Sequence, residues 1–258
     1  MLGAITGDII GSVYEFVDLK PEMDFPLFVN DSEFTDDTVL TVALADSILS
    51  NLDYKTKLYE YYHLYPRCSY GSRFHLWAAR NEQQPYNSWG NGSAMRVSPV
   101  GWAYNDLETV LLKAKESAEV THNHPEGIKG AQATAASIFL ARTGASKFQI
   151  KEYIQNNFNY DLSFDLEELR KHYRFNESCQ DTVPQAIYTF LISDSFEDSI
   201  RKAIYIGGDS DTLACINGSI AEAFYGGVPE NIAKEVYKRI DSRITMITNN
   251  FIEKFNTR

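Results

Sequence analysis

Apolar residues along this chain recur at intervals of three and four, which is the spacing of helices, and alternation typical of strands is scarce. The run TVLTVALADSIL, residues 38–49, is apolar on nearly every side, as expected of a core helix. The best extended candidate, FPLFV at residues 25–29, is short. We therefore expect an all-α fold, with helices over residues 1–16, 38–49, 54–65, 74–80, 94–104, 107–120, 126–142, 148–156, 166–172, 183–192, 196–206, 212–225 and 229–255.

The first predicted helix contains a regular series of glycines. Gly3, Gly7 and Gly11 lie four residues apart and therefore share one helix face. A face without side chains allows another helix or a ligand to come close. No linker, repeat or low-complexity tract divides the chain, so we expect a single compact domain over residues 1–258.

Composition narrows the classes of function. The 258 residues are 44% hydrophobic and 23% charged, which is ordinary for a globular protein with a substantial core. The formal net charge is −11, which argues against general binding of nucleic-acid backbones. A small anionic ligand would need a local source of positive charge, such as a metal ion.

The cysteines and the N-terminus bear on the cellular compartment. Cys68, Cys179 and Cys215 are far apart and have no zinc-type spacing, so we expect free thiols in a reducing compartment. The first residues, MLGAITGDIIGS, lack the basic region of a signal peptide, and no apolar run has membrane-spanning length. We expect a cytoplasmic protein that does not contact membranes, and a self-contained bundle of this kind is compatible with a monomer.

Two acidic clusters stand directly before apolar helices. One is Thr35, Asp36 and Asp37, and the other is Asp209, Asp211 and Thr212. Either cluster alone is typical of helix capping, for which Asp and Thr are favoured residues. If the two helix starts converge, however, four carboxylates meet, and their repulsion favours a bound cation. Oxygen ligands without His or Cys indicate Mg²⁺, Mn²⁺ or Ca²⁺.

Three further features have both structural and functional interpretations. The loop GNGSAMR, residues 90–96, is either a tight turn or a nest of backbone N–H groups that binds phosphate. His122 and His124 form an HxH pair, but no third zinc ligand lies at useful spacing, so polar loop residues are the default interpretation. Glu15 ends the first predicted helix and, taken alone, reads as a solvated acid.

Taken together and in order, several motifs resemble the ADP-ribosylglycohydrolase family. They are GAITGDIIGSVYE, FTDDT, YGSRFHLW, GNGSAMRVSPVGWAY, THNHPEGIKGAQATA and IYIGGDSDTLACINGSIAEAFYG. The resemblance covers the chain from Gly3 to about Pro229, and the two acidic motifs with GNGSAMR between them are its most specific part.

The resemblance implies an all-helical orthogonal bundle around a two-metal centre that holds Mg²⁺ or Mn²⁺. It assigns the metal to residues of the two acidic motifs. Asp209 and Asp211 would then both cap the predicted helix 212–225 and hold metal. The implied metal ligands are Thr35, Asp36, Asp37, Asp209, Asp211 and Thr212.

The resemblance also implies a substrate site. Glu15 matches a glutamate on a flap near the substrate, the glycine-rich loop matches the part that contacts the diphosphate and distal ribose, and His122 matches a residue of the ligand cleft. The implied substrate contacts are Gly90, Asn91, Gly92, Ser93, His122, Tyr70 and Gly71. Ser93 stands where relatives often have Gly or Ala, and residues 158–180 have no recognised counterpart, so acceptor contacts there stay open.

The implied activity is hydrolysis of the bond between ADP-ribose and an acceptor, either a protein side chain such as arginine or serine or a small conjugate. Cleavage of such a bond develops positive charge on the sugar, which carboxylates stabilise. We expect Asp36 or Asp37 to act as the base that orients water, and Glu15 to position substrate or relay a proton. Two alternatives stay open: a non-enzymatic, crystallin-like or ADP-ribose-binding protein, and a two-metal phosphohydrolase.

Overall fold

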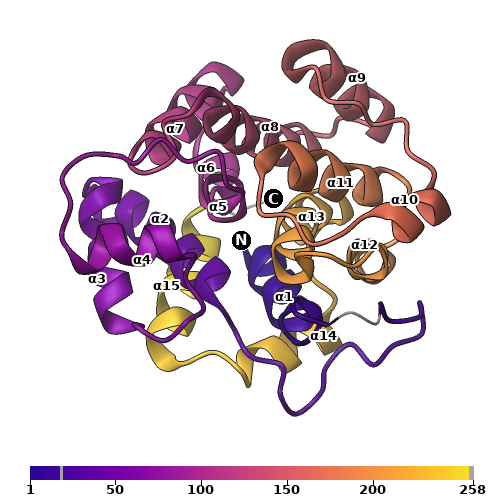
Figure 1. Cartoon of the computed structure of the whole chain (residues 1–258), viewed down its shortest axis with the longest axis horizontal. Coiled ribbons are helices and arrows are strands. Elements are labelled where there is room, and N and C mark those ends of the chain that lie inside the picture. The colour runs from indigo at the N-terminus through magenta and orange to yellow at the C-terminus, as the bar shows by residue number, and fades with distance from the viewer. Residues whose placement is uncertain (18–19, 256–258) are drawn as a thin grey trace.

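In the computed structural model, which describes residues 1–17 and 20–255, the chain folds into the expected all-α arrangement (Figure 1). The helices are α1 (Leu2–Gly11), the 3-10 helix η1 (Ser12–Tyr14), α2 (Asp36–Ser50), α3 (Tyr54–Leu64), α4 (Ser72–Ala79), α5 (Gly92–Met95), α6 (Ser98–Ala103), α7 (Leu107–Glu119), α8 (Pro125–Arg142), α9 (Lys147–Phe158), α10 (Leu166–His172), α11 (Cys179–Leu191), α12 (Phe196–Tyr205), α13 (Ser210–Tyr225), α14 (Glu230–Tyr237) and α15 (Ser242–Phe255). None of these helices combines the length and apolarity that a membrane crossing requires.

The centre of the molecule is the pair α1 and α13, which lie side by side (Figure 1). The predicted glycine face of α1 makes this contact. A Cβ atom added at Gly7 would lie 1.9 Å from the carbonyl oxygen of Ala214, and one added at Gly3 would lie 2.2 Å from that of Gly218. Only glycine permits such an approach. The prediction of close packing on this face is confirmed.

Three predicted helices, over residues 1–16, 94–104 and 229–255, are not continuous in the structure. The first predicted helix, residues 1–16, ends at Gly11 and continues as η1. The short extended candidate 25–29 forms no strand, in agreement with the all-α prediction, and within the described residues the β-type pairing found is an isolated bridge between Gly90 and Ser178. The predicted helix 94–104 is divided into α5 and α6.

Pro99 explains the division of the helix 94–104. A proline lacks the backbone N–H that would bond to the carbonyl of the fourth residue before it. That carbonyl belongs to Met95, and it accepts instead from Thr41 Oγ1 and from Cys215 Sγ, both at 3.3 Å. The break therefore joins the glycine-rich loop to α2 and α13.

The predicted helix 229–255 is also two helices, α14 and α15. Asp241 restarts the chain as a helix, because its carboxylate accepts from the backbone N–H groups of Arg243 at 2.8 Å and Ile244 at 2.9 Å. This N-cap signal is present in the sequence, but the continuous apolar periodicity on both sides obscures it.

Candidate functional site

A cavity of about 440 Å³ lies between α2, α4, α5 and α13, beside the residues that follow η1. Both acidic helix starts open into it. The lining residues are Glu15, Phe16, Asp36, Asp37, Leu40, Ser69, Tyr70, Gly71, Ser72, Arg73, Phe74, Tyr86, Ser88, Gly90, Asn91, Gly92, Met95, Arg96, His122, Glu177, Asp209, Asp211 and Thr212.

The start of α13 is shaped by two glycines. Gly207 and Gly208 have φ values of 73° and 86°, a backbone region that favours glycine, and the turn they make delivers Asp209 to the cavity. Asp209 occupies the N-cap position, but its side chain accepts no capping hydrogen bond. It accepts from Asn91 Nδ2 at 2.6 Å instead. The predicted capping role of Asp209 is therefore wrong, because the glycine loop takes the carboxylate away from the helix end.

The start of α2 is capped by Thr35 and by Asp8 of α1. Thr35 is the N-cap, and its hydroxyl accepts from the backbone N–H of Asp37 at 3.3 Å. Asp8, on α1, is fully buried and accepts from the N–H groups of Thr35 and Thr38, both at 3.0 Å. The Asp8 carboxylate, which belongs to a different helix, thus accepts from backbone N–H groups at the start of α2. Asp36 and Asp37 are consequently free to face the cavity.

Hydroxyl groups connect the two helix starts. Thr35 Oγ1 donates to Asp8 Oδ1 at 2.7 Å and lies 3.4 Å from Asp211 Oδ2. Thr212 Oγ1 donates to Asp37 Oδ2 at 3.3 Å. The structure thus brings together two motifs that are more than 170 residues apart in the chain.

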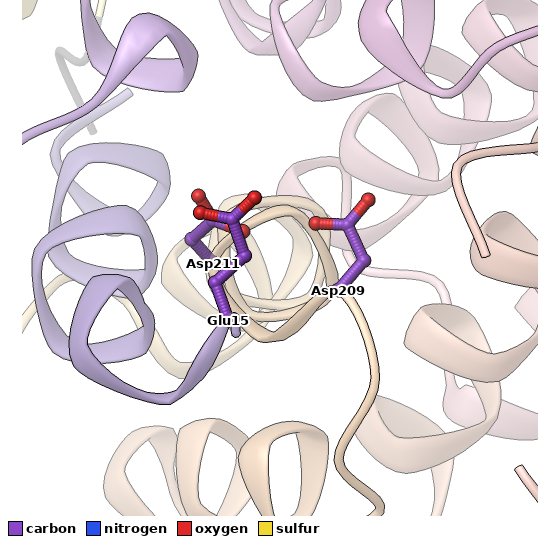
Figure 2. Close-up of side chains that lie close together, drawn as sticks. All are labelled: Glu15, Asp209 and Asp211. Atoms are coloured by element: carbon purple, nitrogen blue, oxygen red, sulfur yellow. The ribbon is translucent and has the colours of Figure 1, made fainter. Parts of the chain in front are cut away.

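Glu15 joins this group. Carboxylate oxygens of Glu15, Asp209 and Asp211 all lie within 4.8 Å of one another. Figure 2 shows the carboxyl groups of Glu15 and Asp211 close together, with Asp209 beside them at the start of α13. From the sequence we expected Glu15 to contact substrate, and the structure places it among the carboxylates suited to hold a cation.

The carboxylates raise one another's pKa. Burial, followed by the charge of Asp211, raises the pKa of Glu15 to about 9. Burial also raises the pKa of Asp209 to about 6, and that of Asp36, Asp37 and Asp211 well above the ordinary range for aspartate. Such a cluster resists ionisation at neutral pH unless positive charge enters it.

The donor set fits a divalent cation. Asp37 Oδ1 is buried and has no hydrogen-bond partner within the described residues, although a buried carboxylate oxygen normally has one. The surrounding ligand atoms are carboxylate and hydroxyl oxygens, the set that hard cations such as Mg²⁺ and Mn²⁺ prefer. The residues able to hold metal are those of the two predicted motifs, Thr35, Asp36, Asp37, Asp209, Asp211 and Thr212, together with Glu15.

The glycine-rich loop differs in detail from the predicted phosphate nest. Two of its N–H groups are already occupied: Gly90 donates to Ser88 Oγ at 3.1 Å and Asn91 donates to the carbonyl of Glu177 at 2.7 Å. Ser93 is buried and does not line the cavity, because its hydroxyl donates to the carbonyl of Gly127 at 2.7 Å. The side chain of Ser93 is therefore engaged within the protein, and the substrate contact predicted for this residue stays a prediction.

Positive charge enters the cavity from two arginines that the sequence analysis did not single out. Arg96 is fully buried and lines the cavity; burial lowers its pKa to about 10, so the guanidinium stays charged at neutral pH. Its Nη2 donates to Ser117 and Thr121, while Nε and Nη1 have no partner within the described residues. Arg73 lies over the ring of Tyr86, with its guanidinium carbon 5.1 Å from the centroid.

The remaining predicted contacts lie on the cavity wall. His122 faces Gly90 and Gly92, since a Cβ added at Gly92 would lie 3.1 Å from His122 Nε2. Burial, and then the charges of Arg96 and Arg73, lower its pKa, so the ring is neutral. Tyr70 is stacked on Phe74 with ring centroids 5.4 Å apart, and its buried hydroxyl has no partner within the described residues. Gly71 also lines the cavity.

Sequence reasoning missed several site residues, among them Asp8, Arg73, Arg96 and Glu177. Asp8, Arg73 and Arg96 lie inside the quoted motifs GAITGDIIGSVYE, YGSRFHLW and GNGSAMR, so position in a motif was a usable signal. Glu177 lies in the segment without a recognised counterpart, and no local pattern distinguishes it from a surface acid.

Comparison with known proteins agrees with this geometry. The profile of the ADP-ribosylglycohydrolase family matches residues 1–258. The chain is 28% identical to the ADP-ribosylhydrolase ARH3 of Mus musculus, over 90% of this chain and 84% of that protein. It is 27% identical to the ADP-ribosylarginine hydrolase Tri1 of Pseudomonas putida, over 92% of this chain and 72% of that protein.

A solved structure shows the same fold. It is described as an ADP-ribosylglycohydrolase-related protein complex, and it superposes with a TM-score of 0.72 at 22% identity, covering 98% of this chain and 96% of that one. The helical bundle and the acidic cavity thus define the class, and the chain belongs to the ADP-ribosylglycohydrolase family.

Proposed function

We propose that this protein is a divalent-metal-dependent hydrolase that releases ADP-ribose from an acceptor. The observation that carries the proposal is the meeting of the two acidic helix starts in one cavity that also contains a buried, partly unpaired arginine. Family membership and the names of the ARH3 and Tri1 relatives support the reaction. Two metal ions, Mg²⁺ or Mn²⁺, are proposed from the number of carboxylates.

The cavity has two electrostatically different parts. The acidic part consists of Glu15, Asp36, Asp37, Asp209 and Asp211. The basic part contains Arg73 and Arg96, whose charges both lower the pKa of His122. A molecule that carries both hydroxyl groups and a diphosphate matches this arrangement, because sugar hydroxyls suit the acidic part and phosphate oxygens suit guanidinium groups. ADP-ribose is such a molecule.

The metal ions, when bound, would neutralise the carboxylates and polarise the sugar hydroxyls and water. The protein's own residues orient the reactants. Asn91 holds Asp209, and Thr212 holds one oxygen of Asp37. Asp36 is partly exposed and lines the cavity, so we assign it the role of the base that receives a proton from water.

The reaction balances as a hydrolysis. The water oxygen forms a bond to the anomeric carbon of ribose, and the bond from that carbon to the acceptor atom breaks. One proton of the water passes through a carboxylate to the departing acceptor, and the other remains on the new hydroxyl group. Positive charge that develops on the sugar is stabilised by Glu15 and the neighbouring carboxylates.

The test is to incubate the purified protein with arginine-linked and serine-linked ADP-ribosyl peptides and O-acetyl-ADP-ribose, with Mg²⁺ or with EDTA, and to identify products by mass spectrometry. We expect intact ADP-ribose in the presence of metal only. AMP among the products would indicate a phosphohydrolase instead. Binding of ADP-ribose without turnover of any conjugate would favour a non-enzymatic member of the family.

Four expectations from the sequence stay predictions: the cytoplasmic location, the monomeric state, the single-domain organisation and the absence of nucleic-acid binding. Size-exclusion chromatography with light scattering tests the second of these directly.

A further inference from the structure

The turn of Gly207 and Gly208 presents Asp209 to the other carboxylates of the cavity. Two successive glycines with φ values of 73° and 86° give this turn its shape, but glycine also leaves the backbone more conformational freedom than any other residue. A carboxylate that follows such a turn has a fixed position only if neighbouring residues hold the turn in place.

Side chains from two distant segments pack on this turn. A Cβ atom added at Gly207 would lie 2.7 Å from Cγ and from Cε of Lys20, and one added at Gly208 would lie 2.5 Å from Cε1 of Tyr173. Neither Lys20 nor Tyr173 is among the residues that line the cavity. The turn is therefore held from outside the cavity.

The Lys20 side chain is fixed at its far end as well. Its Nζ donates to the carbonyl of Arg170 and, at 2.8 Å, to the carbonyl of Tyr173. Both carbonyls belong to the C-terminal end of α10, where backbone oxygens lack helical partners and favour a positive charge. The methylene groups of Lys20 thus lie on Gly207 while its ammonium group caps α10.

Arg170 binds the same segments in the opposite direction. Its Nη1 donates to the carbonyls of Pro21 at 2.8 Å and Tyr205 at 2.6 Å, and its Nη2 donates to the carbonyl of Lys20 at 3.2 Å. Its guanidinium carbon lies 3.9 Å from the centre of the Tyr205 ring. Since Tyr205 is the last residue of α12, Arg170 fixes the backbone two residues before Gly207.

Lys20 and Arg170 therefore form a reciprocal pair, because the side chain of each donates to the backbone carbonyl of the other. The pair joins the segment after η1, the end of α10 and the end of α12 at the glycine turn. On the other side of the turn, the Asp209 carboxylate accepts from Asn91 Nδ2 at 2.6 Å. Asp209 is thus fixed through its backbone by the pair and through its side chain by the glycine-rich loop.

This inference rests on the proposed function, because it concerns the same carboxylates. We propose that Lys20 and Arg170 are positioning residues, which hold the turn of Gly207 and Gly208 so that Asp209 binds divalent metal more tightly than a free turn would allow. A ligand that is already ordered loses less conformational entropy when it binds, and partners behind a metal ligand commonly change metal affinity by 10- to 100-fold.

The test compares the protein with Lys20→Ala, with the conservative variant Lys20→Arg, and with Lys55→Ala as a matched control. Lys55 is half-buried like Lys20 and also donates to a backbone carbonyl, that of Gln83 at 2.9 Å, but it does not line the cavity. The first readout is the dissociation constant of Mn²⁺, measured by electron paramagnetic resonance on the folded protein. The second is amide hydrogen exchange of residues 207–213 in EDTA, measured by mass spectrometry, which reports local opening of the turn without metal.

We expect Lys20→Ala to weaken Mn²⁺ binding about tenfold and to speed exchange of residues 207–213 about tenfold. Lys20→Arg keeps the charge, a donor and most of the methylene packing, and should restore most of both values. Lys55→Ala should change neither. Lys20→Met keeps the packing on Gly207 but loses the bonds to α10, and should change both values in the same direction by a smaller factor.

Unchanged exchange in Lys20→Ala would overturn the claim that the pair holds the turn. Faster exchange with unchanged Mn²⁺ affinity, or an equal loss of affinity in Lys55→Ala, would overturn the positioning role while leaving the metal site intact. If the unaltered protein binds no Mn²⁺, the proposed metal-dependent function fails. Hydrogen exchange in EDTA then decides separately whether Lys20 holds the turn.

Discussion

Helices α2 and α13 both begin with acidic residues at the same cavity, but their backbones are satisfied differently. The start of α2 is capped by Thr35 and by Asp8 from α1. At the start of α13 the N-cap residue Asp209 makes no side-chain capping bond and accepts from the glycine-rich loop instead, and Asp211 accepts from the N–H of Thr212. A similar local sequence thus has two structural solutions, and both leave carboxylates facing one space. The difference predicts that changes at the α2 start reduce stability and function together, whereas changes at the α13 start reduce function alone.

The largest effect is expected for Asp211→Ala at the α13 start. Loss of this carboxylate removes a central member of the cluster, and we expect turnover of the preferred conjugate to fall by about a thousandfold. The helical circular dichroism spectrum should be unchanged, because the side chain caps no distant element. Asp24→Ala, at an exposed aspartate outside the cavity, is the control and should retain full turnover. Normal hydrolysis by Asp211→Ala would show that the carboxylate has no part in the reaction.

Gly7→Ala tests whether the packing of α1 on α13 sets the position of both helix starts. The added Cβ would lie 1.9 Å from a backbone oxygen of α13, so we expect the free energy of unfolding to fall by about 1–3 kcal/mol. Gly71→Ala is the matched control for stability, since a Cβ there meets no atom within 4 Å. Chemical denaturation measures both. Equal stability of the two variants would contradict the packing account.

Asp8→Asn and Asp209→Asn test most directly whether the two helix starts contribute differently to stability. Asp8→Asn replaces one of the two oxygens that accept from Thr35 and Thr38, and we expect about 1–2 kcal/mol less stability. Asp209→Asn should cost no stability in EDTA, because it removes a charge from a repulsive cluster. Thermal denaturation in EDTA decides between these outcomes. A larger loss in Asp209→Asn than in Asp8→Asn would reverse the comparison.

The last prediction concerns the dependence of stability on pH. Folding raises the pKa of Asp209 from 3.8 to about 6 and that of Glu15 from 4.5 to about 9. Since the folded protein binds these protons more tightly than the unfolded chain, stability without metal should fall as pH rises from about 5 to 9. Saturating Mg²⁺ should weaken this dependence, because cations that bind the folded state favour the ionised carboxylates. Melting temperatures across this pH range, with Mg²⁺ and with EDTA, measure the effect; identical slopes would contradict it.

The sequence predicted the helical class and the glycine face of α1, because each depends on local periodicity. It also identified most of the residues that line the cavity. It missed the division at Pro99, where the freed carbonyl of Met95 finds partners on α2 and α13. It also assigned capping of α13 to Asp209, whose side chain accepts from Asn91 of the glycine-rich loop instead. Such partners are close in space but distant in the chain, and a single sequence does not contain that information.

The motifs did not predict that the segment Tyr173–Ser178 brings Glu177 to the cavity. Glu177 faces the cavity because Asn91 and Asn176 hold its backbone, and neither contact follows from local pattern. The motifs therefore indicate the general chemistry of the site, while the position of Glu177 depends on contacts that lie outside them.

The central claim is that the two acidic helix starts hold divalent metal together. The most direct test counts bound Mn²⁺ by electron paramagnetic resonance for the protein, for Asp37→Asn at the α2 start and for Asp211→Asn at the α13 start. We expect two ions per chain in the unaltered protein and a loss of binding in each variant. No bound Mn²⁺ in the unaltered protein, or undiminished binding in both variants, would contradict the claim.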